Sequence, residues 1–137
     1  MDWKIELIVV PVTDVDRAKK FYGEQLGFNI TVDVQNGDFR VVQAEPPGSG
    51  CSIAFGPTLN TMEPGALHGV HLIVNDIEAA YAVLSERGVE LGPLHHFEQT
   101  GEQKPGVSPN RADYESFGSF RDPDGNSWVL QEIGYAK

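Results

Sequence analysis

Two stretches of the chain follow one pattern: VTDVDRAKKF at residues 12–21 and VNDIEAAYAV at residues 74–83. Each follows an apolar run and is closed a few residues later by glycine, in LGF at 26–28 and RGV at 87–89. Aspartate is a favoured helix N-cap, and glycine suits the left-handed position after a last turn. Each stretch therefore predicts a helix, and this internal sequence repeat predicts a pseudo-symmetric fold.

Strand-like segments surround both predicted helices in the same order. The expected strands are residues 5–10, 28–34, 39–44 and 51–55 in the first half, and 68–74, 89–97, 115–121 and 127–133 in the second. The order β-α-β-β-β, found twice, predicts an α+β fold of two tandem βαβββ modules in one integrated domain. The modules are expected at 1–57 and 67–137, with a linker at 58–66. The polar segment 99–112 is expected to be a loop that covers a cavity.

Composition excludes several classes of partner. The 137 residues carry a formal net charge of -10, which disfavours binding to nucleic acid or to an anionic membrane surface. The longest apolar run is too short to span a bilayer, and the N-terminus lacks the features of a signal peptide. Cys51 is the single cysteine, so no intrachain disulfide can form. These observations predict a soluble, cytoplasmic protein without nucleic-acid or membrane partners.

The sequence resembles a known superfamily across nearly its whole length. The resemblance rests on the Val12-x-Asp14 motif followed by LGF at 26–28, and on Asp122-Pro123-Asp124-Gly125-Asn126 near the C-terminus. In this order they are similar to the vicinal-oxygen-chelate group, which includes glyoxalase I, extradiol dioxygenases, fosfomycin-resistance enzymes and bleomycin resistance proteins. The resemblance implies a curved mixed sheet that forms a cup with helices outside, often in a homodimer. It does not fix a reaction, because one fold hosts many functions.

The metal ligands of the related enzymes are missing at the corresponding positions. In those enzymes, four inward-pointing residues hold a divalent ion, and the resemblance places Leu7, Ala54, Gly69 and Val129 at these positions. None of these residues has a side-chain atom that can coordinate a cation. The sequence therefore predicts a protein without a metal or other cofactor.

Strand alternation predicts which residues line the cup, because neighbouring side chains on a strand point to opposite faces. The expected ligand-binding residues are Leu7, Val9, Ser52, Ala54, Gly69, His71, Val129 and Gln131. A mostly apolar lining with a few polar points is typical of a small-molecule pocket. His71 is the candidate catalytic residue, as a general base, and the alternative is a hydrogen-bonded wall residue.

Three further polar groups have both a functional and a structural interpretation. His95 and His96 form an apparent metal pair, yet adjacent strand residues point to opposite faces. The segment with Asp122, Asp124 and Asn126 has the composition of a calcium loop, but its spacing favours a turn. The remaining group could clamp a polar ligand or form structural ion pairs: Arg111, Asp113, Tyr114 and Arg121.

Taken together, the sequence predicts a metal-independent small-molecule-binding homodimer of the glyoxalase/bleomycin-resistance type. The alternative is a divalent-metal-dependent enzyme of the same superfamily with non-standard ligands, such as a lyase or isomerase, a dioxygenase or a thiol transferase. A regulatory protein that binds a protein partner is a third class. Whether the ligand is turned over, and whether modules are exchanged between chains, stays open at this point.

Overall fold

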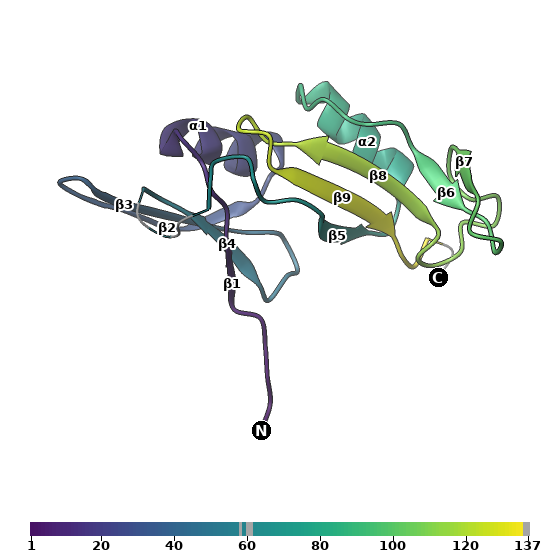
Figure 1. Cartoon of the computed structure of the whole chain (residues 1–137), viewed down its shortest axis with the longest axis horizontal. Coiled ribbons are helices and arrows are strands. Elements are labelled where there is room, and N and C mark those ends of the chain that lie inside the picture. Colours follow the sequence, from purple (N-terminus) through teal and green to yellow (C-terminus); the bar gives the residue numbers. More distant parts are fainter. Residues whose placement is uncertain (58, 60–61, 136–137) are drawn as a thin grey trace. The chain divides into compact units, whose positions relative to one another are not determined.

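The chain folds into two compact units, each containing one sheet and one α-helix. A computed structural model describes residues 1–57, 59 and 62–135 (Figure 1). Unit 1 comprises Met1–Leu67 together with Asp122–Asn126, and unit 2 comprises His68–Arg121 together with Ser127–Lys137. The turn 122–126 connects two strands of unit 2 but packs with unit 1.

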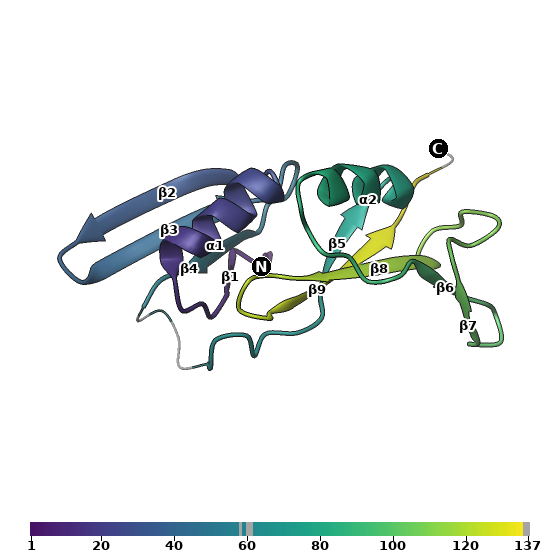
Figure 2. The same ribbon diagram turned by 90° about the horizontal axis from the view of Figure 1, so that it is seen from above.

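Unit 1 has a four-stranded sheet in the order β1-β4-β3-β2, with β1 parallel to β4 and the other pairs antiparallel. Helix α1 covers one face of this sheet, where it contacts β3 (Figure 2). The elements are β1 (Leu7–Val9), α1 (Val15–Lys20), the π-turn η1 (Phe21–Gln25), β2 (Asn29–Asn36), β3 (Phe39–Glu45) and β4 (Ser52–Phe55).

Unit 2 has a five-stranded sheet in the order β5-β9-β8-β6-β7, and helix α2 packs against β8 and β9. Strand β5 is parallel to β9, as β1 is to β4 in unit 1. The elements are β5 (Val70–Val74), α2 (Ile77–Glu86), β6 (His95–Phe97), β7 (Gln103–Pro105), β8 (Ser116–Arg121) and β9 (Ser127–Glu132). The predicted α+β class is confirmed. Unit 1 has the predicted order of one helix among four strands, whereas unit 2 has a fifth strand, β7.

Each unit has its own buried core between helix and sheet. In unit 1 the ring of Tyr22 is fully buried and lies 5.7 Å from that of Phe55, between centroids. In unit 2 the rings of Phe120 and Trp128 stack at 6.1 Å. Helix α2 approaches β8 so closely that a Cβ at Gly118 would collide with the Tyr81 hydroxyl. Glycine is required there by space rather than by backbone conformation.

The structure corrects two predicted elements at the start of the chain. The first helix was expected to continue regularly to Leu26, but after Lys20 it widens into the π-turn, where the Leu26 N–H bonds to the Phe21 carbonyl. The first strand, expected at 5–10, is limited to Leu7–Val9, because its partner strand β4 begins at Ser52, opposite Leu7.

Two further corrections concern the second half. The strand expected at 89–97 is interrupted: Leu91 forms one isolated bridge with Phe120, and β6 begins only at His95. Pro93 lies between them and has no N–H to donate to a neighbouring strand. The expected loop 99–112 contains strand β7, which pairs with β6 as the edge of the sheet.

No α-helix in the described part of the chain is both long enough and apolar enough to cross a membrane.

Candidate functional site

The two faces of the unit 2 sheet differ in burial as strand alternation predicts. Along β9 the side chains of Trp128, Leu130 and Glu132 are buried under α2, whereas Ser127, Val129 and Gln131 are half-buried on the other face. We call this second face the open face of unit 2. His71 is directly beside Val129 on it, and Ile73 is beside Gln131 with 63 % of its surface exposed.

Three aromatic side chains lie on this open face near its outer edge. Phe117 of β8 pairs with Gln131 on one side and with His95 of β6 on the other. The His95 and Phe117 rings stack with centroids 5.8 Å apart and planes at 17°. The Phe97 ring meets the Phe117 ring edge-on at 5.4 Å. We call His95, Phe97 and Phe117 the aromatic cluster.

The aromatic cluster was not among the sites predicted from the sequence. Strand alternation alone puts His95 and Phe97 on the same face of β6, so their proximity could have been predicted from the sequence. The position of Phe117 beside them depends on the pairing of β6 with β8, which the sequence does not encode locally. The prediction that His95 and His96 point to opposite faces is confirmed, because His96 is buried and bonds through Nδ1 to the Gly106 carbonyl at 2.9 Å.

His71, the candidate catalytic residue, is exposed on the open face. Its Nδ1 lies 2.7 Å from the carbonyl oxygen of Gly69. A carbonyl can only accept, so Nδ1 carries the proton and the Nε2 of a neutral ring is left as an acceptor. This arrangement suits a hydrogen bond to a ligand hydroxyl or N–H. Gly69 itself is exposed, with φ of 80°.

The lining residues predicted in the first module lie on adjacent strands of unit 1. Leu7 pairs with Ser52 and Val9 pairs with Ala54, so these four side chains share one face of the sheet. Leu7, Val9 and Ser52 are half-buried, but Ala54 is only 1 % exposed and leaves almost no surface for a ligand.

The described residues contain no group of three or more His, Cys, Asp or Glu side chains arranged to hold a metal ion. Leu7, Ala54, Gly69 and Val129, which the resemblance places at the ligand positions, offer no side-chain donor atom. The donor set of this chain therefore does not fit the divalent ion of those enzymes.

Arg111 forms ion pairs within the fold. Its guanidinium donates to Glu132 through Nε at 2.7 Å and through Nη2 at 2.5 Å, and Nη1 donates to Glu78 at 2.7 Å. It also lies 3.6 Å from the centre of the Tyr135 ring. The hydrogen bonds from Arg111 hold the pKa of Glu132 below its usual value, although burial opposes this effect. Of the two interpretations of Arg111, the structural ion pair is confirmed.

The other members of the predicted clamp do not join Arg111 in a common group. Asp113 accepts the Gly134 N–H at 2.7 Å, the Tyr114 side chain is exposed, and the Arg121 side chain is exposed at the end of β8.

Glu132 was not predicted from the sequence as an important residue. It is fully buried and accepts the Ile77 N–H at 2.8 Å in the first turn of α2. The sequence does hold a sign of this burial: Glu132 alternates with Trp128 and Leu130, so it belongs to the helix-facing side of the strand.

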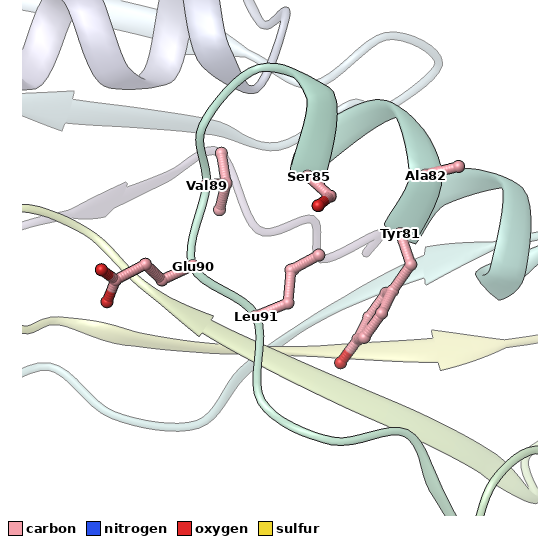
Figure 3. A pocket seen from close by; sticks show the side chains of 6 residues that line it. All are labelled: Tyr81, Ala82, Ser85, Val89, Glu90 and Leu91. Atoms are coloured by element: carbon pink, nitrogen blue, oxygen red, sulfur yellow. The ribbon is translucent and has the colours of Figure 1, made fainter.

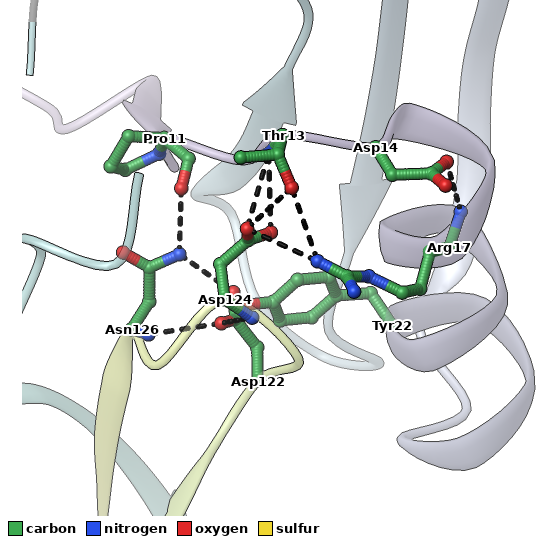
Figure 4. A network of polar contacts seen from close by, with 8 residues as sticks. All are labelled: Pro11, Thr13, Asp14, Arg17, Tyr22, Asp122, Asp124 and Asn126. Carbon is green, nitrogen blue, oxygen red and sulfur yellow. Dashed lines mark hydrogen bonds and ion pairs between the residues drawn. The ribbon is translucent and has the colours of Figure 1, made fainter. Parts of the chain in front are cut away.

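The turn 122–126 is held by a network of polar contacts with unit 1 (Figure 4). Asp122 Oδ2 accepts the Tyr22 hydroxyl at 2.7 Å and the Asn126 side-chain amide at 2.8 Å, while Oδ1 accepts two backbone N–H groups of the turn. The Asn126 amide also donates to the Pro11 carbonyl at 2.8 Å. The carboxylate is thus fully used by the protein, which agrees with the predicted turn.

Asp124, in the same turn, is directed at the start of α1. It accepts the Thr13 hydroxyl at 2.7 Å and Arg17 Nη2 at 3.1 Å (Figure 4). Asp14 caps the helix by accepting the Arg17 N–H at 3.0 Å, as the sequence predicts. Both acidic residues have structural partners.

Surface hollows among the described residues also lie outside the predicted lining. One of about 710 Å³ lies between α2 and the segment after it (Figure 3) and is lined by Tyr81, Ala82, Ser85, Val89, Glu90 and Leu91. Others, of about 400 and 220 Å³, lie beside Lys19 and His96. The Tyr81 hydroxyl donates to the Gly92 carbonyl at 2.6 Å, and burial raises its pKa. It also accepts the Ser119 N–H at 3.0 Å, so this hydroxyl links α2 to β8.

Comparison with known proteins defines the class. Residues 4–130 match the sequence model of the Glyoxalase/Bleomycin resistance protein/Dioxygenase superfamily, and the chain belongs to this superfamily. The fold is the curved, open-sheet architecture of its solved members, as the resemblance implied.

Three similar proteins cover nearly the whole chain. TnmS3, an antibiotic binding protein from Streptomyces sp. CB03234, is 32 % identical with a TM-score of 0.75, over 96 % of this chain and 97 % of that one. A superfamily member from Sphaerobacter thermophilus DSM 20745 is 30 % identical with a TM-score of 0.72, over 96 % and 98 %. The uncharacterized protein YetH of Bacillus subtilis (strain 168) is 29 % identical over 133 residues, 94 % of this chain and 98 % of YetH.

Proposed function

We propose that this protein binds a small organic molecule with a flat aromatic part on the open face of unit 2, without a metal ion. The observation that carries the proposal is the aromatic cluster beside Gln131 and close to Val129 and His71. Stacked and edge-on rings on a half-exposed sheet face offer a surface for a further ring. The likeness to an antibiotic binding protein supports the same class of function.

The polar groups of the face limit what the ligand can be. His71 Nε2 offers an acceptor, and the Gln131 side chain lies between Ile73 and Phe117. The net charge of -10 favours a neutral or cationic ligand over an anionic one. The proposed role of His71 is to bind the ligand.

The proposed metal independence is argued from the side chains at the expected ligand positions. Leu, Ala, Gly and Val side chains stand at the four ligand positions implied by the superfamily. A ligand held by stacking and apolar contact needs no cation, so binding is expected to be the same in buffer containing a chelator.

The test is calorimetric titration of a ligand found by screening, in the presence of chelator. Phe117→Ala removes the ring that both His95 and Phe97 contact, and is expected to weaken binding on the order of tenfold or more. Phe39→Ala removes an exposed ring in unit 1 and serves as the matched control, with unchanged affinity expected. Equal affinity of the Phe117 variant and the wild type would overturn the proposed site.

A further inference from the structure

The hollow of about 220 Å³ beside His96 lies in unit 2, where β6 ends. Its lining comes from residues 96–99 at the end of β6 and after it, residues 109–110 of the loop between β7 and β8, and Glu115 just before β8. The Phe97 N–H donates to the Glu115 carbonyl at 3.3 Å, which ties two of these segments together. The walls of the hollow are therefore held by the fold of unit 2 itself.

The side chains around the hollow include two carboxylates and no cation. Glu98 and Glu115 supply the carboxylates, and neither has an ion-pair partner among the described residues. Lys104 lies opposite His96 in the pairing of β6 with β7, but its Nζ pairs with Glu102 at 3.2 Å. The negative charge at the hollow is thus left without a counter-charge from the described chain.

His96 adds a buried acceptor that the fold leaves free. Its side chain is only 8 % exposed and Nδ1 donates to the Gly106 carbonyl, so the Nε2 of a neutral ring is an acceptor. No described residue bonds to Nε2. Protein atoms do not enclose it either, because Ser108 Oγ is the one buried polar side-chain atom without a partner in the described part of the chain. Since His96 lines the hollow, Nε2 opens into it.

These groups together favour a small organic cation. An anion would meet two carboxylates and no positive group, and the described residues form no cluster suited to a metal ion. The hollow is smaller than the pockets of about 300–1,000 Å³ that hold drug-sized ligands, so a small molecule fits it best. An ammonium group donates up to three hydrogen bonds, and the Phe97 ring in the lining can attract a cation through its face.

We propose that this hollow binds the ammonium group of a small primary amine, between the carboxylates of Glu98 and Glu115 and the Nε2 of His96. The ammonium group donates to these acceptors and supplies the missing counter-charge. The inference goes beyond the proposed function. Phe97 is the one member of the aromatic cluster in this lining, and amine binding does not require a ligand on the open face.

The test is a titration of isotope-labelled protein with butylammonium chloride, followed by NMR. Saturable shifts are expected for the His96 ring and for the backbone amides of Glu98, Asn110 and Glu115, because these residues line the hollow. Sodium butyrate has the same number of carbon atoms and the opposite charge. It is expected to leave these signals unchanged.

Variants of exposed residues locate the site. Glu98→Gln removes one carboxylate and is expected to raise the dissociation constant about threefold, as for the loss of an exposed ion pair. Asn110→Lys places an ammonium group of the chain itself beside the carboxylates, and is expected to abolish the shifts. Glu86→Gln on α2 and Gln35→Lys on β2 make the same changes in net charge and are expected to bind like the wild type. All four positions are exposed, so circular dichroism is expected to show folded protein.

The results that would overturn the site are equally specific. The first is a wild type without saturable shifts in butylammonium, and the second is an equal response to butyrate. A Glu86→Gln variant as weak as Glu98→Gln would show that only the overall charge matters. Unchanged affinity of folded Asn110→Lys would place the amine elsewhere on the protein.

Discussion

Glu132 determines much of the polar structure of unit 2. Its side chain is fully buried, it bonds to the first turn of α2, and it pairs with Arg111 through two hydrogen bonds. Arg111 has a positive φ of 50°, an uncommon backbone conformation for a residue with a side chain. The ion pair holds this part of the loop between β7 and β8 in place.

Removing the charge of Glu132 is expected to be costly. Glu132→Gln leaves a partly buried guanidinium without its main partner, and a loss of about 3 kcal/mol in the free energy of unfolding is expected. Glu78→Gln removes an exposed partner of the same arginine and is expected to cost less than about 1 kcal/mol. Urea unfolding measures both, and equal effects would contradict the assigned roles.

The same residue predicts a dependence on pH. Hydrogen bonds from Arg111 lower the pKa of Glu132 in the folded state from the ordinary value of 4.5. A lowered folded-state pKa stabilises the protein above the unfolded-state pKa, and this contribution is lost as the pH falls through the folded-state value. The difference in stability between wild type and Glu132→Gln is therefore expected to be full at neutral pH and to shrink below about pH 4.5. Urea unfolding across this pH range checks the sign.

At the scale of elements, the turn 122–126 contributes to unit 1 through Asp122. Asp122→Ala leaves the Tyr22 hydroxyl, the Asn126 amide and two backbone N–H groups without their acceptor. A loss of about 3 kcal/mol in unfolding free energy is expected, because four buried hydrogen bonds lose their acceptor at once. Asp16→Ala, on the exposed surface of α1, is the control, with an expected change within about 0.5 kcal/mol.

Sequence patterns predicted which elements form better than where they end. Caps at Asp14 and Asp76 are local chemistry, and both helices begin where the caps predict. Strand ends depend on partners: β1 is short because β4 is short, and β7 exists because β6 offers an edge. Alternation likewise predicted the open face of β9, whereas the aromatic cluster required the register between β6 and β8.

At the scale of the whole molecule, the proposal makes a prediction about metal. Protein purified without a metal-affinity step is expected to contain no stoichiometric divalent ion. Its melting temperature is expected to be unchanged by chelator, because no metal-binding energy is linked to folding. Equimolar zinc, nickel, iron or manganese by elemental analysis would contradict the proposed function.

The central claim is that a ligand binds beside Val129 without metal, and a thermal-shift screen of aromatic and heterocyclic compounds in chelator tests it most directly. A ligand at about a hundred times its dissociation constant stabilises by about 2.7 kcal/mol, a melting shift of about 5 °C in a domain of this size. The account predicts such a shift for the wild type and none for Val129→Trp, whose indole would fill the open face while the protein stays folded. A shift that persists in folded Val129→Trp, or that appears only after a divalent metal is added, would contradict it.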